Sequence, residues 1–483
     1  MKRRWLAVVI SGSLLTGAGG TYTGMKWYYH DLQQKIEENT AQIPLKGQQV
    51  LPDLSKIAQA YDLIMKSYVK KVDEKQLVEG AIQGMVGTLN DPFSVYMDAK
   101  TATQFNNSLD SSFEGIGAEV AQKDGKIVIV APYKDSPAEK AGLRPKDVIV
   151  KIDGVSTHGL DLTEATTKIR GKKGTSVTLE IQREGASNPL TFVVKRESIP
   201  LETVFSAIKK QGEKSIGYLE ITQFSKDTAV DFNQKLQKLE SQNISGLIID
   251  VRGNPGGYLS SVEDMLKGLV PNDKPYFQIE QRNGDKLPYY SKLKQKKSYP
   301  IAVLVDEGSA SAAEILASSL QEADGYTLIG EKTFGKGTVQ TAMPLGDGSS
   351  IKLTMYKWLT PDGNWIHQKG IKPNIEVKQP EYFYVNPLKV DDSLKIDANN
   401  EQVKLAQQIL SGLGYGPGRE DGYFDNQTEQ AVKAFQNQEK LPITGEIDTK
   451  TAEQLDTALE QARKEEKNDL QLQVALKYIS NQN

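Results

Sequence analysis

The sequence contains no cysteine. This absence excludes disulfide bonds, thiolate metal sites, a cysteine nucleophile and the lipid-modified cysteine of a lipoprotein. Histidine is also scarce, since His30, His158 and His367 are the only three in 483 residues. A zinc site built on histidine would need nearly all of them, so we expect no metal site and no cofactor.

An excess of charge of either sign is missing as well, because 59 lysine and arginine residues balance 62 aspartate and glutamate residues. A protein that binds a phosphate backbone needs a strongly basic surface. Nucleic acid is therefore not an expected partner. The length of the chain favours several domains over a single hydrophobic core.

Charged residues are absent from residues 5–25, directly after Lys2, Arg3 and Arg4. An uncharged stretch of this length can cross a bilayer as a helix, and the positive residues before it stay on the cytoplasmic side. We therefore predict that residues 1–30 anchor the protein to the membrane and that the rest of the chain is extracytoplasmic. A cleaved signal segment is the alternative, although no Ala-x-Ala cleavage site is evident.

Apolar residues at three-to-four spacing between residues 54 and 89 predict two amphipathic helices. Pro92 ends the second pattern, because proline cannot continue a helix. Residues 31–98 are thus predicted to form a stalk and a helical region whose apolar faces need a partner surface. The chain's own core or a second copy in a homodimer would supply it.

Short β-type runs on either side of one helical segment between residues 113 and 196 predict a mainly β domain. The ordered landmarks GIGA (115–118), SPA (136–138), AGL (141–143), DVI (147–149) and IDG (152–154) resemble a PDZ domain of the bacterial protease type. We place this domain at residues 99–200. An ordinary glycine-rich turn is the alternative for the GIGA segment alone.

The resemblance to a PDZ domain implies binding of protein or peptide substrates through their free C-termini. An extended peptide adds to the edge of the sheet, and its carboxylate meets converging backbone N–H groups. The residues expected to bind it are Gly115, Ile116, Gly117 and Ala118. Arg170 is a candidate sensor of the bound peptide, with a solvated surface arginine as the alternative.

From residue 215 the pattern becomes that of an α/β domain, with nearly all-apolar strands at residues 246–251 and 301–305. Ser311 follows the second of these strands and stands at the start of a helix. Unpaired N–H groups and the helix dipole can stabilise an oxyanion there. The expected donors are the amide of Ala312 and that of Gly256 or Gly257. The alternative is that Ser311 only caps the helix.

Lys336 lies between Gly335 and Gly337, an unusual setting for a solvated lysine, because glycines often mark a backbone forced close to a neighbour. Burial lowers the pKa of a lysine, so a neutral Lys336 can act as general base toward a serine hydroxyl. Gln340 lies four residues further on, and contact with Lys336 requires a bend in the strand. A position on the face of a sheet is the open alternative for Gln340.

Four motifs resemble those of the carboxyl-terminal processing peptidases, also called tail-specific proteases, over residues 55–380. They are DVRGNPGG (250–257), GSASAAE (308–314), GEKTFGKGTVQ (330–340) and TPDG (360–363). The resemblance implies that Ser311 is the nucleophile, that Lys336 is the base and that Gln340 positions the base. It also implies a spiral α/β core akin to Clp protease and crotonase, which we place at residues 201–385. The family usually has serine where this chain has Ala313, and aspartate where it has Asn374.

After a linker at residues 386–400, residues 401–458 are similar to the peptidoglycan-binding domain of cell-wall hydrolases. The similarity lies in an amphipathic helix followed by DGYFD (421–425), AVKAFQ (431–436) and TGEID (444–448). A generic small helical bundle is the alternative. Residues 459–483 form a charged helical tail to which we assign no chemistry.

The sequence thus predicts a multidomain α/β protein with N-terminal helices, a β-sandwich-like PDZ domain, a spiral protease core and a small all-α peptidoglycan-binding domain. We expect an extracytoplasmic serine endopeptidase that is associated with the membrane and the cell wall. Three alternatives remain, namely a Ser–His enzyme that uses His367, a non-catalytic scaffold and a cell-wall hydrolase. The sequence does not decide whether the PDZ domain delivers substrate tails or blocks the active site until a tail binds.

Overall fold

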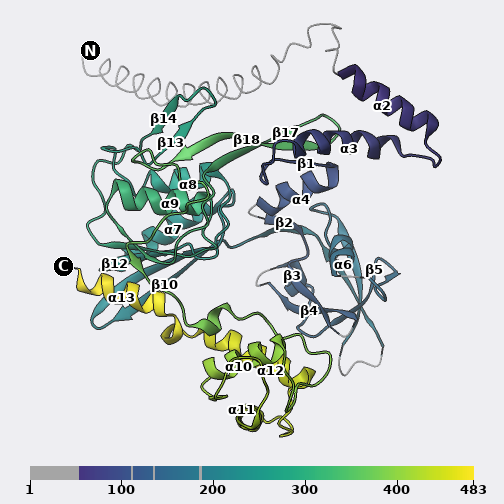
Figure 1. Cartoon of the computed structure of the whole chain (residues 1–483), viewed down its shortest axis with the longest axis vertical. Helices are drawn as coiled ribbons and strands as arrows, with labels where there is room; N and C mark the ends of the chain where they lie inside the picture. The colour runs from purple at the N-terminus through teal and green to yellow at the C-terminus, as the bar shows by residue number, and fades with distance from the viewer. Residues whose placement is uncertain are drawn as a thin grey trace, which may run out of the picture. The chain divides into compact units, whose positions relative to one another are not determined.

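The computed structural model describes residues 54–109, 112–123, 125–133, 136–160, 162–183 and 188–482 (Figure 1). The predicted membrane anchor at residues 1–30 and the predicted stalk up to residue 53 lie outside these ranges. Among the helices in the described ranges, none combines the length and the apolar character needed to span a bilayer. The chain divides into two compact units between Met85 and Val86.

The N-terminal unit contains the two helices that the apolar spacing predicts. They are α2 (Leu54–Ser67) and α3 (Glu74–Gly87), and α3 runs across the boundary between the units. Neither helix has a buried residue. Large apolar side chains such as Leu63 and Met85 are exposed, so the apolar faces of both helices are open in the described part of the chain.

The second unit begins with β1 (Val95–Met97) and α4 (Ala99–Leu109), which lead into the predicted PDZ region. Its antiparallel sheet has the strand order β3-β4-β5-β7-β8, with β6 beside β5, while β2 and β9 pair where the chain enters and leaves the domain. The core lies between this sheet and α6 and includes Ile127, Leu179 and Ala165. The elements are β2 (Ser112–Gly115), β3 (Ala118–Lys123), β4 (Lys126–Pro132), α5 (Pro137–Lys140), β5 (Val148–Ile152), β6 (Val155–Ser156), α6 (Leu162–Ile169), β7 (Ser176–Gln182), β8 (Leu190–Lys195) and β9 (Glu197–Pro200).

A six-stranded sheet of order β10-β11-β12-β15-β16-β19 forms the centre of the α/β region. All neighbours pair in parallel except the edge strand β10. Strands β12 and β15 are buried over their whole length, which explains their continuous apolar sequences. The strands are β10 (Val204–Gln211), β11 (Lys214–Ile221), β12 (Gly246–Asp250), β15 (Ile301–Val305), β16 (Thr327–Gly330) and β19 (Ile375–Glu376).

Helices cover both faces of this central sheet. On one face pack α7 (Thr228–Glu240), α8 (Leu259–Leu266) and α9 (Ala312–Ser318), which continues as a π-helical turn at Ser319–Ala323. On the other face packs α13 (Leu470–Asn481), whose Leu476 and Ile479 contact a cluster with Ile248 and Leu304. Within the predicted tail at residues 459–483, α13 is therefore a core helix of a sheet whose last strand, in chain order, ends at Glu376.

A second sheet of order β1-β18-β13-β14 flanks the central one, and β17 pairs with β18. Its pairs are antiparallel, and the β17–β18 register shifts at a bulge between Val339 and Gln340. The strands are β13 (Phe277–Glu280), β14 (Lys286–Tyr289), β17 (Thr338–Pro344) and β18 (Ser350–Leu359).

The C-terminal helical domain consists of α10 (Glu401–Gly412), α11 (Asn426–Gln438) and α12 (Thr449–Lys464), preceded by a 3-10 turn at Glu381–Tyr384 and followed by another at Glu466–Asn468. Each helix begins at a residue whose side chain accepts a backbone N–H three positions on, namely Asn400, Asp425 and Asp448. A separate core around Phe435 and Leu455 holds the three helices together.

Candidate active site

Ser311 lies between the end of β15 and the first turn of α9, and its backbone is strained. Its φ angle is 55°, a left-handed conformation that residues other than glycine rarely adopt. A sharp strand-to-helix turn of this kind presents a nucleophile at a helix start. Ser311 and Glu314 form a capping box, in which the Glu314 carboxylate accepts the Ser311 N–H at 2.9 Å. Capping does not by itself account for the φ angle of Ser311, because N-cap residues ordinarily have an extended backbone.

The glycine-rich turn after β12 lies against Ser311. A Cβ atom on Gly256 would be 2.8 Å from Ser311 Cβ, whereas one on Gly257 would be 2.1 Å from the backbone oxygen of Phe224. The Gly256 N–H already donates to Asn254 Oδ1 at 2.8 Å, which removes it from the set of free oxyanion donors. In the described chain, the N–H groups of Gly257 and Ala312 have no hydrogen-bond partner.

A fully buried carboxylate, Glu314, joins the Ser311 turn to the loop that carries Lys336. Its Oε2 accepts hydrogen bonds from Ser311 N–H at 2.9 Å and from Lys336 N–H at 2.8 Å. Its Oε1 accepts from the Thr333 hydroxyl at 2.6 Å and from Gly335 N–H at 2.7 Å. Because one oxygen holds both amides, the nitrogens of Ser311 and Lys336 lie within about 6 Å of each other. The only sequence signal for Glu314 was the capping-box pattern, which did not indicate the other three donors.

Two indole groups fix the main chain around Lys336. Trp358 Nε1–H donates to Lys336 O at 2.8 Å, and Trp365 Nε1–H donates to Gly337 O at 2.7 Å. A Cβ atom on Gly335 would come within 2.8 Å of a backbone nitrogen, and one on Gly337 within 2.7 Å of another. The flanking glycines therefore let this loop pass close to residues 365–370.

The Lys336 side chain is half-buried, and its Nζ lies 5.0 Å from the centre of the Phe93 ring. Within the described chain it has no hydrogen bond and no ion pair. Burial lowers the pKa of the Lys336 amine most, and the charge of Lys352 lowers it further, while Glu314 and Asp91 oppose the shift. The net effect is a pKa below the ordinary lysine value, which is the direction a general base requires.

Among the described residues, no hydrogen bond joins Gln340 to Lys336. Its Nε2 instead donates to Thr338 Oγ1 at 2.9 Å and to Thr354 Oγ1 at 3.2 Å. The strand has a bulge between Val339 and Gln340, and Thr354, which the Gln340 amide bonds, lies on β18.

His367, the residue of the Ser–His alternative, belongs to an aromatic cluster. Its ring stacks on Trp365 with centroids 5.1 Å apart, and Phe93 meets it edge-on at 6.1 Å. Its Nδ1 accepts a long hydrogen bond of 3.4 Å from Gly337 N–H. No interaction joins His367 to Ser311 in the described residues, so this geometry gives the alternative no support.

A groove of about 510 Å³ lies in the PDZ domain, beside β3 and α6. Ile116, Gly117, Ala118 and Arg170 line it, as the sequence predicts, whereas Gly115 lies just behind its wall. The Arg170 guanidinium lies 4.9 Å from the centre of the Phe113 ring. It is exposed, and in the described chain it makes no ion pair. The groove thus has a mainly apolar lining that also includes polar residues such as Gln104 and Glu119, and Arg170 is the cation in it.

We predict that Glu314→Gln destabilises the α/β region by about 2–3 kcal/mol, the value of hydrogen bonds to a charged acceptor. An amide NH₂ group in place of either oxygen would face two donors without accepting from them. Urea denaturation followed by tryptophan fluorescence measures the change in the free energy of unfolding. Glu307→Gln, an exposed substitution on the loop before α9, is the control and should change it by less than about 0.5 kcal/mol. Equal stability of the two variants would contradict the role of Glu314.

Comparison with known families assigns four segments of the chain. Residues 215–377 match peptidase family S41, residues 128–183 match a PDZ domain, residues 399–455 match a putative peptidoglycan binding domain, and residues 14–101 match the N-terminal domain of the activating protease CtpB.

Two relatives from Bacillus subtilis agree with this assignment. The carboxy-terminal processing protease CtpB of Bacillus subtilis is 56% identical over 482 residues, which are 99% of each chain. CtpA of the same organism is 43% identical over 88% of this chain and 90% of its own. Among solved structures, the photosystem II D1 C-terminal processing protease is 27% identical, with a TM-score of 0.41, and the match covers 67% of this chain and 86% of that one.

The multidomain α/β architecture with a PDZ domain, a protease core and a C-terminal helical domain is thereby confirmed. The chain belongs to peptidase family S41, as a serine-type peptidase of the carboxy-terminal processing group.

Proposed function

We propose that the protein is an extracytoplasmic endopeptidase in which Ser311 is the nucleophile and Lys336 the general base. The observation that carries this proposal is the shared oxygen of Glu314, which holds the amides of both residues. The free, half-buried amine of Lys336 provides further support. Gln340 would position the base through Thr338 at the start of β17, because its amide bonds that hydroxyl.

In this mechanism the neutral Lys336 amine removes the proton of Ser311 Oγ as that oxygen attacks the substrate carbonyl carbon. The N–H groups of Ala312 and Gly257 stabilise the resulting oxyanion. The lysine ammonium then protonates the leaving amine as the C–N bond breaks, which leaves an ester on Ser311. A water molecule, deprotonated by the same amine, hydrolyses the ester and restores the serine.

We predict that Ser311→Ala and Lys336→Ala each reduce kcat by at least about 10³-fold. One variant lacks the nucleophile and the other lacks the base, and neither group is effective without its partner. The His367→Ala variant should keep most of the activity. Cleavage of an unstructured protein with an apolar C-terminus, followed by mass spectrometry, measures these rates. Full activity of Ser311→Ala would exclude the proposed nucleophile. Loss of activity in Ser311→Ala and His367→Ala, with Lys336→Ala still active, would favour the Ser–His mechanism.

The pH dependence should respond to charges near Lys336 with opposite signs. The Lys336 amine acts when deprotonated, so kcat/KM rises as pH increases through its pKa. Lys352→Met removes a charge that lowers this pKa and should move the acid limb to higher pH. Asp91→Asn removes a charge that raises it and should move the limb to lower pH. Lys332→Met, an exposed change on the same loop, is the control, and shifts of the same sign in all three variants would contradict the assignment.

We further propose that the PDZ groove binds the free C-terminus of the substrate through Gly115, Ile116, Gly117 and Ala118, with Arg170 sensing its carboxylate. The exposed guanidinium at the groove supports this role. Deletion of residues 101–198 separates the two modes of action. Faster cleavage of a small peptide would exclude pure delivery of substrate, and complete loss of cleavage would exclude pure inhibition.

For this groove we predict that a substrate with an amidated C-terminus has a KM at least about tenfold higher than its free-acid form, because a charge-assisted hydrogen bond is lost. Arg170→Met should raise KM for the free acid and leave the amide nearly unchanged. Arg144→Met, which alters an exposed arginine elsewhere in the domain, should preserve the difference. The same KM for both substrate forms in the unmodified enzyme would exclude carboxylate recognition.

The site of action that we propose is the space between membrane and cell wall. The basic start and uncharged residues 5–25 support an N-terminal anchor, and the match at residues 399–455 supports binding of peptidoglycan. The open apolar faces of α2 and α3 support a homodimer. Membrane fractionation, sedimentation with purified cell walls and analytical ultracentrifugation test these three points in turn.

A further inference from the structure

The chain returns to the central sheet after the peptidoglycan-binding domain. Helix α13 packs Leu472, Leu476 and Ile479 against the face of β11, β12, β15 and β16. Two polar contacts accompany this packing, an ion pair of 2.6 Å between Lys209 and Glu466 and a larger network around Asp469. The network is of interest because it reaches the glycine-rich turn beside Ser311.

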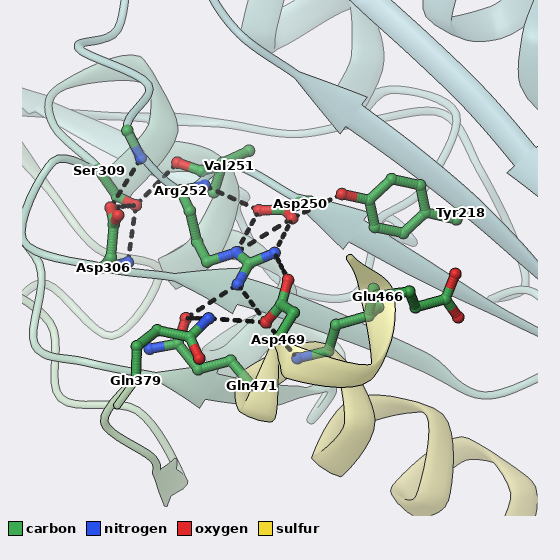
Figure 2. A network of polar contacts seen from close by, with 12 residues as sticks. Tyr218, Asp250, Val251, Arg252, Asp306, Ser309, Gln379, Glu466, Asp469 and Gln471 are labelled. Atoms are coloured by element: carbon green, nitrogen blue, oxygen red, sulfur yellow. Dashed lines mark hydrogen bonds and ion pairs between the residues drawn. The ribbon is translucent and has the colours of Figure 1, made fainter. Parts of the chain in front are cut away.

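Asp469 stands at the first turn of α13 and faces Arg252 (Figure 2). Its Oδ1 and Oδ2 accept hydrogen bonds from Arg252 Nη1 and Nη2 at 2.8 and 2.7 Å. The same carboxylate caps α13, since Leu472 N–H donates to it at 3.0 Å. Gln379 and Gln471 surround the pair with further hydrogen bonds. A bidentate pair of this kind fixes both partners in orientation as well as in distance.

Arg252 connects this carboxylate to the central sheet. Its guanidinium also bonds Asp250, the last residue of β12, at 2.6 Å between Nη2 and Oδ2. Asp250 in turn accepts a hydrogen bond from the Tyr218 hydroxyl at 2.7 Å. The carboxyl of Asp469 is partly buried, which raises its pKa, but the hydrogen bond and the charge of Arg252 lower it, and the net pKa lies below the usual range. The ion pair is therefore intact at neutral pH.

The turn that starts at Arg252 ends at the predicted oxyanion donors. Gly253 N–H donates to Asp306 Oδ1 at 2.8 Å, and Ala310 N–H donates to Asn254 O at 2.9 Å. Residues 252–257 thus run from the Asp469 ion pair to the neighbourhood of Ser311. A displacement of Arg252 would be transmitted along a short turn that is tied to the nucleophile loop.

We propose that Asp469 is a positioning residue for the oxyanion side of the active site, acting through Arg252 on residues 252–257. The segment that returns from the peptidoglycan-binding domain is then part of the proteolytic apparatus. This inference rests on the proposed function, because it assigns to the turn the role of holding the Gly257 N–H in place. A residue so far along the chain would otherwise be judged a tail residue without function.

The test uses the full-length protein and compares two ion pairs between the core and the C-terminal segment. Asp469→Asn keeps a helix-capping side chain but loses the charge that holds Arg252. Glu466→Gln is the matched control, because it removes the charge that pairs with Lys209. Lys209 lies on β10, outside the glycine-rich turn. Asp469→Glu retains the charge, and Arg252→Lys retains the opposite charge without the bidentate geometry.

We expect Asp469→Asn and Arg252→Lys to reduce kcat by about tenfold. This reduction is smaller than the one caused by removing a whole oxyanion donor. KM should stay within about twofold of the value for the unmodified enzyme. The affinity for a peptide aldehyde, which forms an oxyanion-like adduct with a serine, should fall in parallel. The Glu466→Gln variant should keep both values, and Asp469→Glu should recover most of kcat. Thermal unfolding checks that all variants are folded at the assay temperature.

Equal kcat values for Asp469→Asn and Glu466→Gln would overturn the inference, as would a change confined to KM. If Asp469→Asn does not fold, the kcat and aldehyde affinity of Arg252→Lys decide by the same criteria. The Ser311→Ala variant separates a failure of the proposed function from a failure of the role of Asp469. An active Ser311→Ala enzyme refutes the proposed function itself, whereas an inactive one together with an unaffected Asp469→Asn enzyme refutes only the role of Asp469.

Discussion

The arrangement of the candidate active site depends on one buried carboxylate. Glu314 has no exposed surface, and its two oxygens receive four hydrogen bonds from two separate loops. An ionised carboxylate is stable away from water only when its acceptor positions are occupied. Movement of either loop would leave part of that charge unsatisfied. The positions of Ser311 and Lys336 are therefore coupled through desolvation, although their side chains have different roles in the proposed reaction.

This coupling also bears on the charge state of Lys336. Glu314 lies close enough to stabilise an ammonium ion, which would oppose the function of a base. Its oxygens, however, are directed at main-chain N–H groups and a hydroxyl, so they form no ion pair with the amine. Burial and the nearby Lys352 then prevail in setting the pKa. The site thus uses a carboxylate to build the loop without making the lysine a permanent cation.

Local sequence patterns predicted those features that short segments determine. The apolar runs predicted β12 and β15, and the flanking glycines predicted a crowded backbone at Lys336. The remaining features depend on side chains that are distant in sequence or on local competition for hydrogen bonds. Asn254 occupies the Gly256 amide, and the bulge before Gln340 directs that side chain to Thr354.

The packing of helix α13 on the central sheet escaped prediction for a different reason. Its sequence has an apolar stripe, but the complementary surface is the face of a sheet whose strands end at Glu376. The sequence predicted a charged helical tail at residues 459–483, without a surface for it to pack on. Only the folded arrangement shows that Asp469 and Arg252 meet, because no periodicity or motif relates positions separated by a complete domain.

The late position of α13 has a consequence for biogenesis. While the chain is being synthesised, one face of the central sheet remains uncovered until α13, which follows the peptidoglycan-binding domain, has been made. Contacts of such long sequence separation form late in folding. We therefore expect that a nascent chain has no proteolytic activity until α13 has been released from the ribosome. This delay would keep an incomplete enzyme from attacking neighbouring proteins.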